Sequence, residues 1–464
     1  MRPQHATLAT GNNEMRNIVK KSKHAKYELI SNGSLVGILA ISLIVSITTV
    51  FFTLVLPHCR IYPWSDEWSY LAPMIQPRPS YIGWLFAQHV DHRIPIQKIL
   101  HEILLKATAF DFRSLIALNI IVSAFISFIL IYTYKIYRGY IAIGDLAIPL
   151  CIMSFGSGFS QWGFEFQFLS TLLFSSTFLL FATLYSVHSK KIHIKLAITS
   201  LIFCSLCGLN GMIVSTSVLV LLCPFLICRK QLANSVPWFA LGLALLINVC
   251  LWLAWTPSAA SNGHAPLRAV LNFSFKMLSS PWIVYNFTNP GWKLAILLVL
   301  CILGVVTSIY SVFKTRSFVD FSVFAMLVSA IALIGAVAWG RSKEMSWHPG
   351  LEMHYGTLAI LVPIASWMAV SKVMKRSVIE ILGFALASLF SLAFYANYQW
   401  RIGSDQANYD TNLEAEHAIF DAETPQAVAR EHMSVYFFVD TPQTQGSVAE
   451  GITLLRSYRA EHQK

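Results

Sequence analysis

Long apolar runs constrain this chain more than any other feature of its sequence. Of its 464 residues, 55% are hydrophobic and only 12% are charged, against about 25% charged residues in a soluble domain. Eleven apolar segments are long enough to cross a bilayer, or nearly so: 35–56, 114–134, 141–157, 167–187, 196–209, 211–228, 236–256, 293–313, 318–339, 355–370 and 378–397. The sequence therefore predicts an all-α polytopic membrane protein with about eleven transmembrane helices.

Two of these segments follow one another closely. Residues 196–209 are short for a span, and the pair Asn210-Gly211 stands between them and the next apolar run. Asn and Gly favour tight turns, but irregular backbone at membrane depth also occurs in re-entrant elements. Both interpretations of residues 196–228 stay open: two spans joined by a tight turn, or one re-entrant element.

Lys and Arg residues are concentrated in alternate loops, and this pattern predicts the orientation. If all eleven segments span, these basic residues lie on one side: Arg16, Lys20, Lys21, Lys23, Lys26, Lys135, Arg138, Lys190, Lys191, Lys195, Arg229, Lys230, Lys314, Arg316, Lys372, Lys375 and Arg376. Cytoplasmic loops carry the excess of positive charge, so this side is predicted to be cytoplasmic.

The same alternation predicts the layout of the chain. Residues 1–34 form a basic cytoplasmic tail, residues 35–397 form the transmembrane domain, and residues 398–464 form a small polar tail on the opposite, outer face. The outer loops are 57–113, 158–166, 257–292 and 340–354. Within the tail, the apolar stretch 434–439 predicts a single strand.

Part of the first outer loop is amphipathic. Within residues 94–110, one helical face holds Ile94, Ile96, Ile99, Leu100, Ile103, Leu104 and Ala107, and the other holds Gln97, Lys98, His101, Glu102 and Lys106. This spacing predicts an interfacial helix lying on the membrane, although a helix packed over the bundle would show the same pattern.

Several classes of function are not supported. The sequence contains no Walker motif, no GxGxxG and no HExxH, so no nucleotide or redox cofactor is predicted. The eight cysteines lie almost entirely in apolar runs and imply neither a disulfide framework nor a metal site. The net charge of +11 follows from the loop asymmetry, so no nucleic-acid partner is expected.

An acidic pair directly follows the first span. Asp66 and Glu67 lie between Trp64 and Trp68, at the surface of the membrane. A carboxylate in this position could take a proton from an acceptor hydroxyl as general base, or could hold a divalent cation. The alternative is an ordinary solvated loop end.

A second polar group in the same loop is Asp91-His92-Arg93. The planar fork of Arg93 matches phosphate oxygens, and Asp91 or His92 could orient it. In the outer turn between two later spans, Glu165 is a lone carboxylate among aromatic residues, a composition typical of a sugar-binding lining.

Cationic and aromatic residues border the last long outer loop. Arg341 and Lys343 follow one span and could clamp a phosphate, and His354 and Tyr355 open the next span. Both residues lie where the head group of a lipid-linked substrate would rest. Interfacial anchoring is the alternative for all four.

The acidic pair, the amphipathic helix, the number of spans and the polar outer face together resemble the GT-C class of membrane glycosyltransferases. The pattern is similar to bacterial relatives of the protein O-mannosyltransferase and aminoarabinose-transferase group. The resemblance implies that Asp66 is the base and Glu67 its neighbour, and that Arg93 and Arg341 hold the phosphate of a polyprenyl-phosphate sugar. His354-Tyr355 stands where uncharacterised members have Arg-Tyr.

The resemblance implies an enzyme with its active site on the outer face of the membrane. The compact loops and the lack of eukaryotic retention signals favour the bacterial inner membrane, so this face is expected to be periplasmic. The acceptor would be a hydroxyl of a glycan, lipid or protein, and the sugar would transfer with inversion. Two other classes stay open: a flippase or transporter of lipid-linked saccharides, and a glycan polymerase. A transport path would place charged residues near mid-membrane, whereas Asp145, Asp320 and Glu380 lie near predicted cytoplasmic ends.

Overall fold

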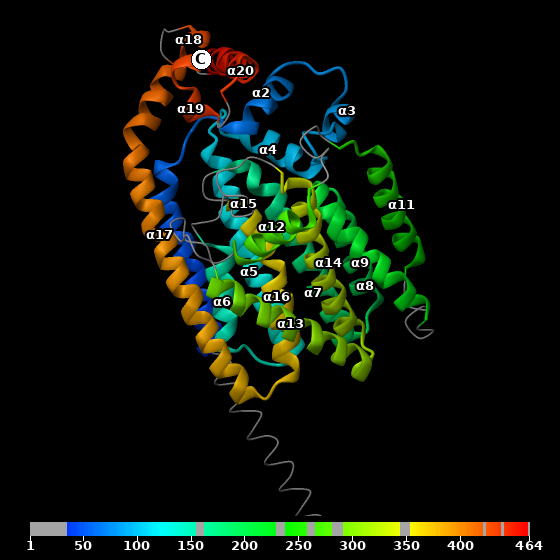
Figure 1. The fold of residues 1–464 in the computed structure, drawn as a ribbon. Helices are drawn as coiled ribbons and strands as arrows, with labels where there is room; N and C mark the ends of the chain where they lie inside the picture. The colour runs from blue at the N-terminus through cyan, green and yellow to red at the C-terminus, as the bar shows by residue number, and fades with distance from the viewer. Residues whose placement is uncertain are drawn as a thin grey trace, which may run out of the picture.

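The protein is all-helical in the part of the chain that the structure describes. This computed structural model describes residues 35–154, 162–228, 237–257, 265–280, 291–343, 353–420, 424–437 and 440–462. Within these ranges there is no strand, only an isolated antiparallel bridge between His89 and His92. The helices stand side by side as a bundle, and a cap of short helices covers one end (Figure 1). The predicted all-α polytopic membrane fold is confirmed.

Eight helices in the described ranges are long and apolar enough to cross a membrane. They are Leu35–His58, α5 (Arg113–Arg138), α7 (Phe166–His188) with the turn η6 (Gly163–Glu165) before it, α9 (Leu209–Ile227), α13 (Gly291–Thr315), α14 (Phe318–Arg341), the pair α15 (Met353–Ala359) and α16 (Leu361–Val373), and α17 (Arg376–Phe420). The other three predicted spans form shorter helices: η4 (Ile143–Leu146) with α6 (Ala147–Ile152), α8 (Lys191–Ser205) and α11 (Trp238–Ala254). All eleven predicted segments thus lie on helices in the described ranges, eight of which are long enough to span.

Residues 196–228 form two helices, α8 and α9, joined by a short turn. Gly208 adopts φ +95° in this turn, a left-handed conformation that glycine adopts at little cost. The helices then pack against each other so closely that a Cβ on Gly211 would lie 1.8 Å from the carbonyl oxygen of Cys204. Residues 196–228 therefore form a helical hairpin.

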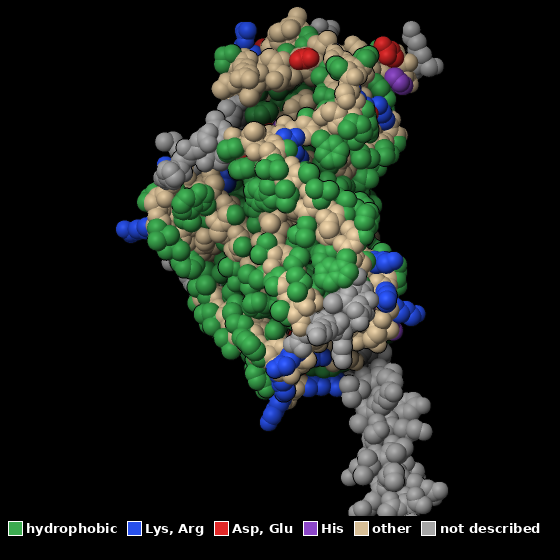
Figure 2. All heavy atoms as spheres, turned by 90° about the vertical axis from the view of Figure 1, so that its right-hand side faces the viewer, with side chains coloured by type: hydrophobic (Ala, Val, Ile, Leu, Met, Phe, Trp, Pro, Cys, Tyr) green, Lys and Arg blue, Asp and Glu red, His purple; other side chains and the backbone are tan. Residues whose placement is uncertain are grey.

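The surface of the bundle divides into zones of different polarity. Hydrophobic side chains cover the middle of the face shown in Figure 2, and Lys and Arg gather at its lower end. Large apolar side chains such as Ile302 and Phe313 on α13 are exposed, as expected for residues that contact lipid rather than water. The end with the basic residues is called the basic end below, and the opposite end the outer end.

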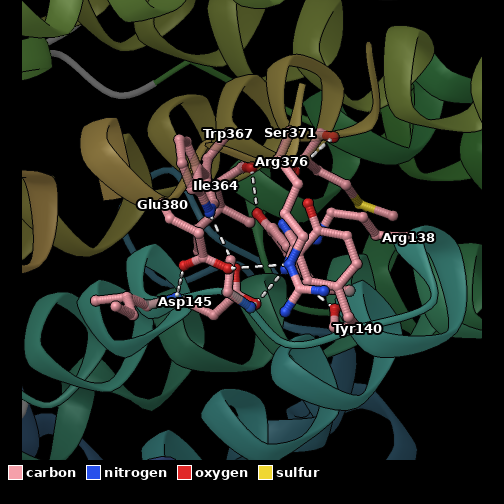
Figure 3. A network of polar contacts seen from close by, with 12 residues as sticks. Arg138, Tyr140, Asp145, Ile364, Trp367, Ser371, Arg376 and Glu380 are labelled. Atoms are coloured by element: carbon pink, nitrogen blue, oxygen red, sulfur yellow. Dashed lines mark hydrogen bonds and ion pairs between the residues drawn. The ribbon is translucent and has the colours of Figure 1, made fainter. Parts of the chain in front are cut away.

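A buried network of polar contacts fixes the basic end (Figure 3). Asp145 forms an ion pair with Arg138 and accepts hydrogen bonds from the indole nitrogen of Trp367, at 3.0 Å, and from the backbone N–H of Ala142, at 2.9 Å. Close by, Glu380 accepts from the backbone N–H of Ile143 at 3.1 Å. These contacts join η4 to α5, α16 and α17, so the carboxylates have a structural role at this end of the bundle.

The outer end carries a cap with its own apolar core. The first outer loop contributes η3 (Ser65–Glu67), α2 (Trp68–Ile75), α3 (Tyr81–Phe86) and α4 (Pro95–Ala107), and the C-terminal region contributes α18 (Pro425–Glu431), α19 (Met433–Tyr436) and α20 (Pro442–His462). Trp68 and Tyr436 connect the two parts, because the Trp68 indole donates to the Tyr436 carbonyl at 3.2 Å. The strand predicted at 434–439 is wrong for residues 434–436, which belong to α19; residues 438 and 439 lie outside the described ranges.

The predicted amphipathic helix exists as α4, and its two faces can now be assigned. Gln97 and His101 on the polar face are buried, whereas Ile103 on the apolar face is 59% exposed. Ile94, just before the helix, is buried. The polar side of the helix therefore faces the protein, and part of its apolar side faces outward, as an interfacial helix requires.

Candidate functional site

Segments far apart in the sequence meet at the outer end of the bundle, beneath the cap. They are the acidic turn 64–68, the bridge region 89–92, the turn 162–168 that opens α7, the α8–α9 turn, and the facing ends of α14 and α15. The convergence brings most of the predicted site residues together.

Asp66 and Glu67 are adjacent but lie in different surroundings. Ser65, directly before them, has φ +55°, a conformation that costs about 1–3 kcal/mol for a non-glycine residue and that clusters at functional sites. The Asp66 side chain is 25% exposed, and its Oδ1 lies 3.6 Å from Nε2 of His89. Glu67 is buried, and its Oε2 accepts the Trp64 backbone N–H at 2.9 Å. Of the pair, only Asp66 can be reached from outside.

Burial raises the pKa of Glu67 to about 8, although the backbone amides of Trp64, Gly163 and Phe164 oppose this shift. At neutral pH Glu67 is therefore mostly protonated. Its position against Gly163 is tight, because a Cβ on that glycine would lie 2.8 Å from Oε1 of Glu67. The two adjacent carboxyl groups thus lie in different environments.

The bridge region holds Asp91 against Arg341. His89 and His92 exchange backbone hydrogen bonds of 2.8 Å, and Val90 between them has φ +49°, which is unusual for a β-branched residue. The resulting tight turn directs Asp91 inward, where its Oδ2 accepts from Nη2 of Arg341 at 2.8 Å. This ion pair joins the first outer loop to the end of α14, 250 residues later.

His92 lies at the centre of this cluster. Burial lowers its pKa to about 4, helped by the charge of Arg341, and the charges of Asp91 and Asp66 act in the opposite direction. His92 is therefore neutral at physiological pH. Its Nδ1 accepts the backbone N–H of Leu209 at 3.3 Å, so the ring proton is on Nε2, which can donate to a ligand.

Aromatic rings line the region between the acidic turn and α15. Trp162 lies 5.6 Å from Trp64 and 6.3 Å from His354, as measured between ring centroids, and His354 stacks on Phe168 at 5.6 Å. Tyr355 is buried behind His354, with its ring centroid 4.1 Å away. Faces of this kind suit the C–H surface of a sugar ring.

Glu165 is fully buried at the beginning of α7, and neither of its carboxyl oxygens has a hydrogen-bond partner within the described ranges. The neighbouring Phe164 stacks on Tyr70, and Phe166 lies against His101. The ring nitrogens of His101 and the side-chain amide of Gln97 are likewise buried without partners there. Glu165 therefore belongs to a buried polar layer under α4 rather than to an exposed turn.

Two predicted phosphate ligands lie elsewhere. The Arg93 guanidinium donates to the backbone carbonyls of Phe86 and Ala254, so it joins α3 to the end of α11. Lys343 is exposed after α14, and residues 344–352 lie outside the described ranges. Among the cationic residues predicted to hold phosphate, Arg341 is the one in the cluster around His92.

No group of three or more His, Cys, Asp and Glu residues within the described ranges could hold a metal ion. The divalent cation considered for Asp66 and Glu67 would have Asp66 as its first ligand, because Glu67 is buried and mostly protonated at neutral pH.

Two contributors to the site could not be identified from the sequence. Gly208 is one, because a Cβ there would lie 3.2 Å from Nδ1 of His92. The other is Trp255, whose indole nitrogen donates to the backbone carbonyl of Asp91 at 3.1 Å. A Gly in the α8–α9 turn and a Trp after an apolar run are common features, and only the fold connects them to the first outer loop.

The protonation state of Glu67 predicts a pH dependence of stability. Between pH 5 and 8 the unfolded chain has released the Glu67 proton, whereas the folded protein retains it up to about pH 8. Because the unfolded state then binds fewer protons, the free energy of unfolding decreases with pH, by at most about 1.4 kcal/mol per pH unit. Thermal unfolding in detergent should show that the wild type loses stability with rising pH more steeply than Glu67→Gln does.

Glu67→Gln also serves as the control. His92 and His101 contribute equally to the pH dependence of stability in both proteins, so their contributions cancel in the comparison. Burial lowers the pKa of His101 to about 3 and that of His92 to about 4. Parallel stability curves for the two proteins would contradict the assignment of a protonated Glu67.

No protein-family model and no curated protein matches the sequence. Among solved structures, the chain is similar to the Archaeoglobus fulgidus oligosaccharyltransferase tethered with an acceptor peptide containing the NVT sequon via a disulfide bond. The TM-score is 0.47 with 13% sequence identity, and the match covers 90% of this chain and 63% of that chain. This chain thus spans less than two thirds of the length of its structural neighbour. A likeness of this size carries no information on activity or substrate.

Proposed function

We propose that the protein is a GT-C-type membrane glycosyltransferase that moves a sugar from a polyprenyl-phosphate carrier to a hydroxyl acceptor. The observation that carries the proposal is the cluster around His92, where the partly exposed Asp66 and the Asp91–Arg341 ion pair of 2.8 Å lie close to the rings of Trp162 and His354. A reachable carboxylate and a guanidinium next to aromatic rings are the groups that such a transfer needs.

In the proposed reaction Asp66 takes the proton of the acceptor hydroxyl. The acceptor oxygen attacks the anomeric carbon, and the bond from that carbon to the phosphate oxygen breaks with the electron pair going to the phosphate. Attack from the side opposite the phosphate inverts the anomeric centre. Arg341 stabilises the charge that develops on the phosphate, which is usually the largest single contribution to such catalysis.

The remaining site residues have supporting roles. Trp162 and His354 offer ring faces to the sugar, and the Nε2–H of His92 can donate to a sugar hydroxyl or a phosphate oxygen. Asp91 holds Arg341 in position through their 2.8 Å ion pair. A glycan, a lipid or a protein could supply the acceptor hydroxyl.

The proposed location is the bacterial inner membrane. With the basic end in the cytoplasm, as the distribution of Lys and Arg predicts, the cluster around His92 and the C-terminal cap face the periplasm. Lipid-linked sugars would then reach the site from the outer leaflet, along apolar surface such as that on the face shown in Figure 2.

Replacing Arg341 tests the proposal. We expect Arg341→Ala to lower kcat for sugar transfer by about 10²–10³-fold, the range found when one stabilising donor is removed from a developing anion. Arg341→Lys keeps the charge and should retain more activity. Transfer from a labelled polyprenyl-phosphate sugar in membranes measures the effect, and thermal unfolding of each variant separates catalysis from folding. Near-normal turnover in folded Arg341→Ala would contradict the role.

A further inference from the structure

A basic pocket lies between the end of the first helix and the C-terminal half of α17. The two helices lie side by side on one flank of the bundle (Figure 1). This pocket is partly open to solvent. Its polar lining includes His58, Arg60, Arg401, Asp405, Asn408 and Asn412.

The charge of this pocket is unbalanced. Arg60 and Arg401 both line it, and Asp405 is its one acidic lining residue. Nε of Arg401 donates to Oδ2 of Asp405 at 2.8 Å, and Nε of Arg60 donates to Oδ1 of Asn412 at 3.4 Å. One carboxylate therefore faces two guanidinium groups, and the pocket keeps a net positive charge.

The two guanidinium groups are also close enough to repel each other. Burial, together with the charge of Arg401, lowers the pKa of Arg60, and the Arg401 side chain is itself buried. Arginine does not lose its proton in proteins. An anion between the two groups would relieve the repulsion and would accept hydrogen bonds in the forked geometry that arginine favours.

The position of the pocket along the bundle axis indicates a ligand at the membrane surface. The first helix ends at His58, and the predicted span within α17 ends at residue 397. Arg401 follows about one helical turn later, roughly 6 Å along the axis at 1.5 Å per residue. The pocket thus opens where apolar helix surfaces give way to polar loops, the level at which phospholipid head groups lie.

We propose that this pocket binds the phosphate of an anionic lipid in the outer leaflet. Arg60 and Arg401 would contact the phosphate oxygens, the side-chain amide of Asn412 could donate to the head group, and the acyl chains would lie along the first helix and α17. The site is separate from the cluster around His92 and does not depend on the proposed transferase activity.

The test measures binding by the full-length protein in detergent, without sugar donor or acceptor. Inorganic phosphate, dihexanoyl phosphatidic acid, dihexanoyl phosphatidylglycerol and a short-chain polyprenyl phosphate are titrated, and the rise in Tm gives an apparent Kd. Dihexanoyl phosphatidylcholine is the zwitterionic control. We expect the anionic lipids to raise Tm more than phosphatidylcholine does. A response to polyprenyl phosphate alone would assign the pocket to the carrier and overturn the general lipid site.

Variants make the test specific. Arg401→Gln should weaken the apparent Kd for phosphatidic acid at least tenfold, whereas Arg430→Gln, on the exposed surface of α18, should leave it unchanged. Asp405→Asn removes the opposing charge and should tighten binding severalfold, so the proposal stays testable if Arg401→Gln does not fold. Equal affinities in the wild type and Asp405→Asn, or no preference for anionic lipids, would overturn the proposal.

Discussion

Replacing Asp66 by Asn should reduce sugar transfer by about 10²–10⁴-fold, the contribution typical of a general base. The substitution keeps the shape of the side chain and removes its capacity to take a proton. Asp66 is partly exposed and its contact with His89 is long, at 3.6 Å, so the variant should fold normally. The measurement is the single-turnover rate of transfer from a labelled polyprenyl-phosphate sugar in membranes.

Two matched variants separate this role from general effects of charge. Glu67→Gln should keep turnover within about tenfold of the wild type, because Glu67 is already mostly protonated at neutral pH. Asp111→Asn changes another acidic residue of the same outer loop, one that pairs with Arg113 at 2.7 Å, and should have little effect. If Glu67→Gln were inactive and Asp66→Asn active, the assignment of the base would be reversed.

The largest loss of stability is expected for Asp145→Ala. Arg138 is 3% exposed and Asp145 is fully buried, and removal of one partner from such a pair costs about 3–5 kcal/mol because the remaining charge has no compensation. The variant also loses the hydrogen bonds that Asp145 accepts from Trp367 and Ala142. Thermal unfolding in detergent should show a large decrease in Tm.

The control for this prediction is a pair at the protein surface. Asp111→Ala breaks an ion pair in which the two side chains are 30% and 37% exposed, and such pairs contribute about 0–1 kcal/mol. The double variant Arg138→Met, Asp145→Leu should recover much of the lost stability, since it leaves no unpaired charge. A decrease in Tm of equal size for Asp111→Ala and Asp145→Ala would contradict the structural role of the network.

The sequence predicted the bundle because apolar length is a local property. Segments such as 114–134 and 318–339 need only their own composition to be recognised as spans. The lengths of the short helices α6, α8 and α11 were harder to predict, because an apolar run does not specify where a helix begins. The strand predicted at 434–439 failed because Tyr436 packs against Trp68 from the first outer loop, a contact that local periodicity cannot reveal.

Part of the candidate site could also be predicted from local sequence. Asp66, Asp91 and Arg341 could be chosen because charged groups near hydrocarbon are costly unless they are paired or functional, and the structure places them around His92. The different surroundings of Asp66 and Glu67 could not be foreseen, since the burial of Glu67 depends on Gly163 from a distant turn. Arg93 resembled a phosphate ligand, yet the carbonyls that it contacts belong to other segments.

The most direct test asks whether Asp66, after the first span, and Arg341, at the end of α14, face the same compartment. Single cysteines are introduced by Ser69→Cys, Lys343→Cys and Lys190→Cys, all at exposed positions, in a background with the exposed Cys228 and Cys250 replaced by Ala. A membrane-impermeant maleimide should label the first two from the periplasmic side and the third only from the cytoplasmic side. Labelling of positions 69 and 343 from opposite sides would contradict a shared site.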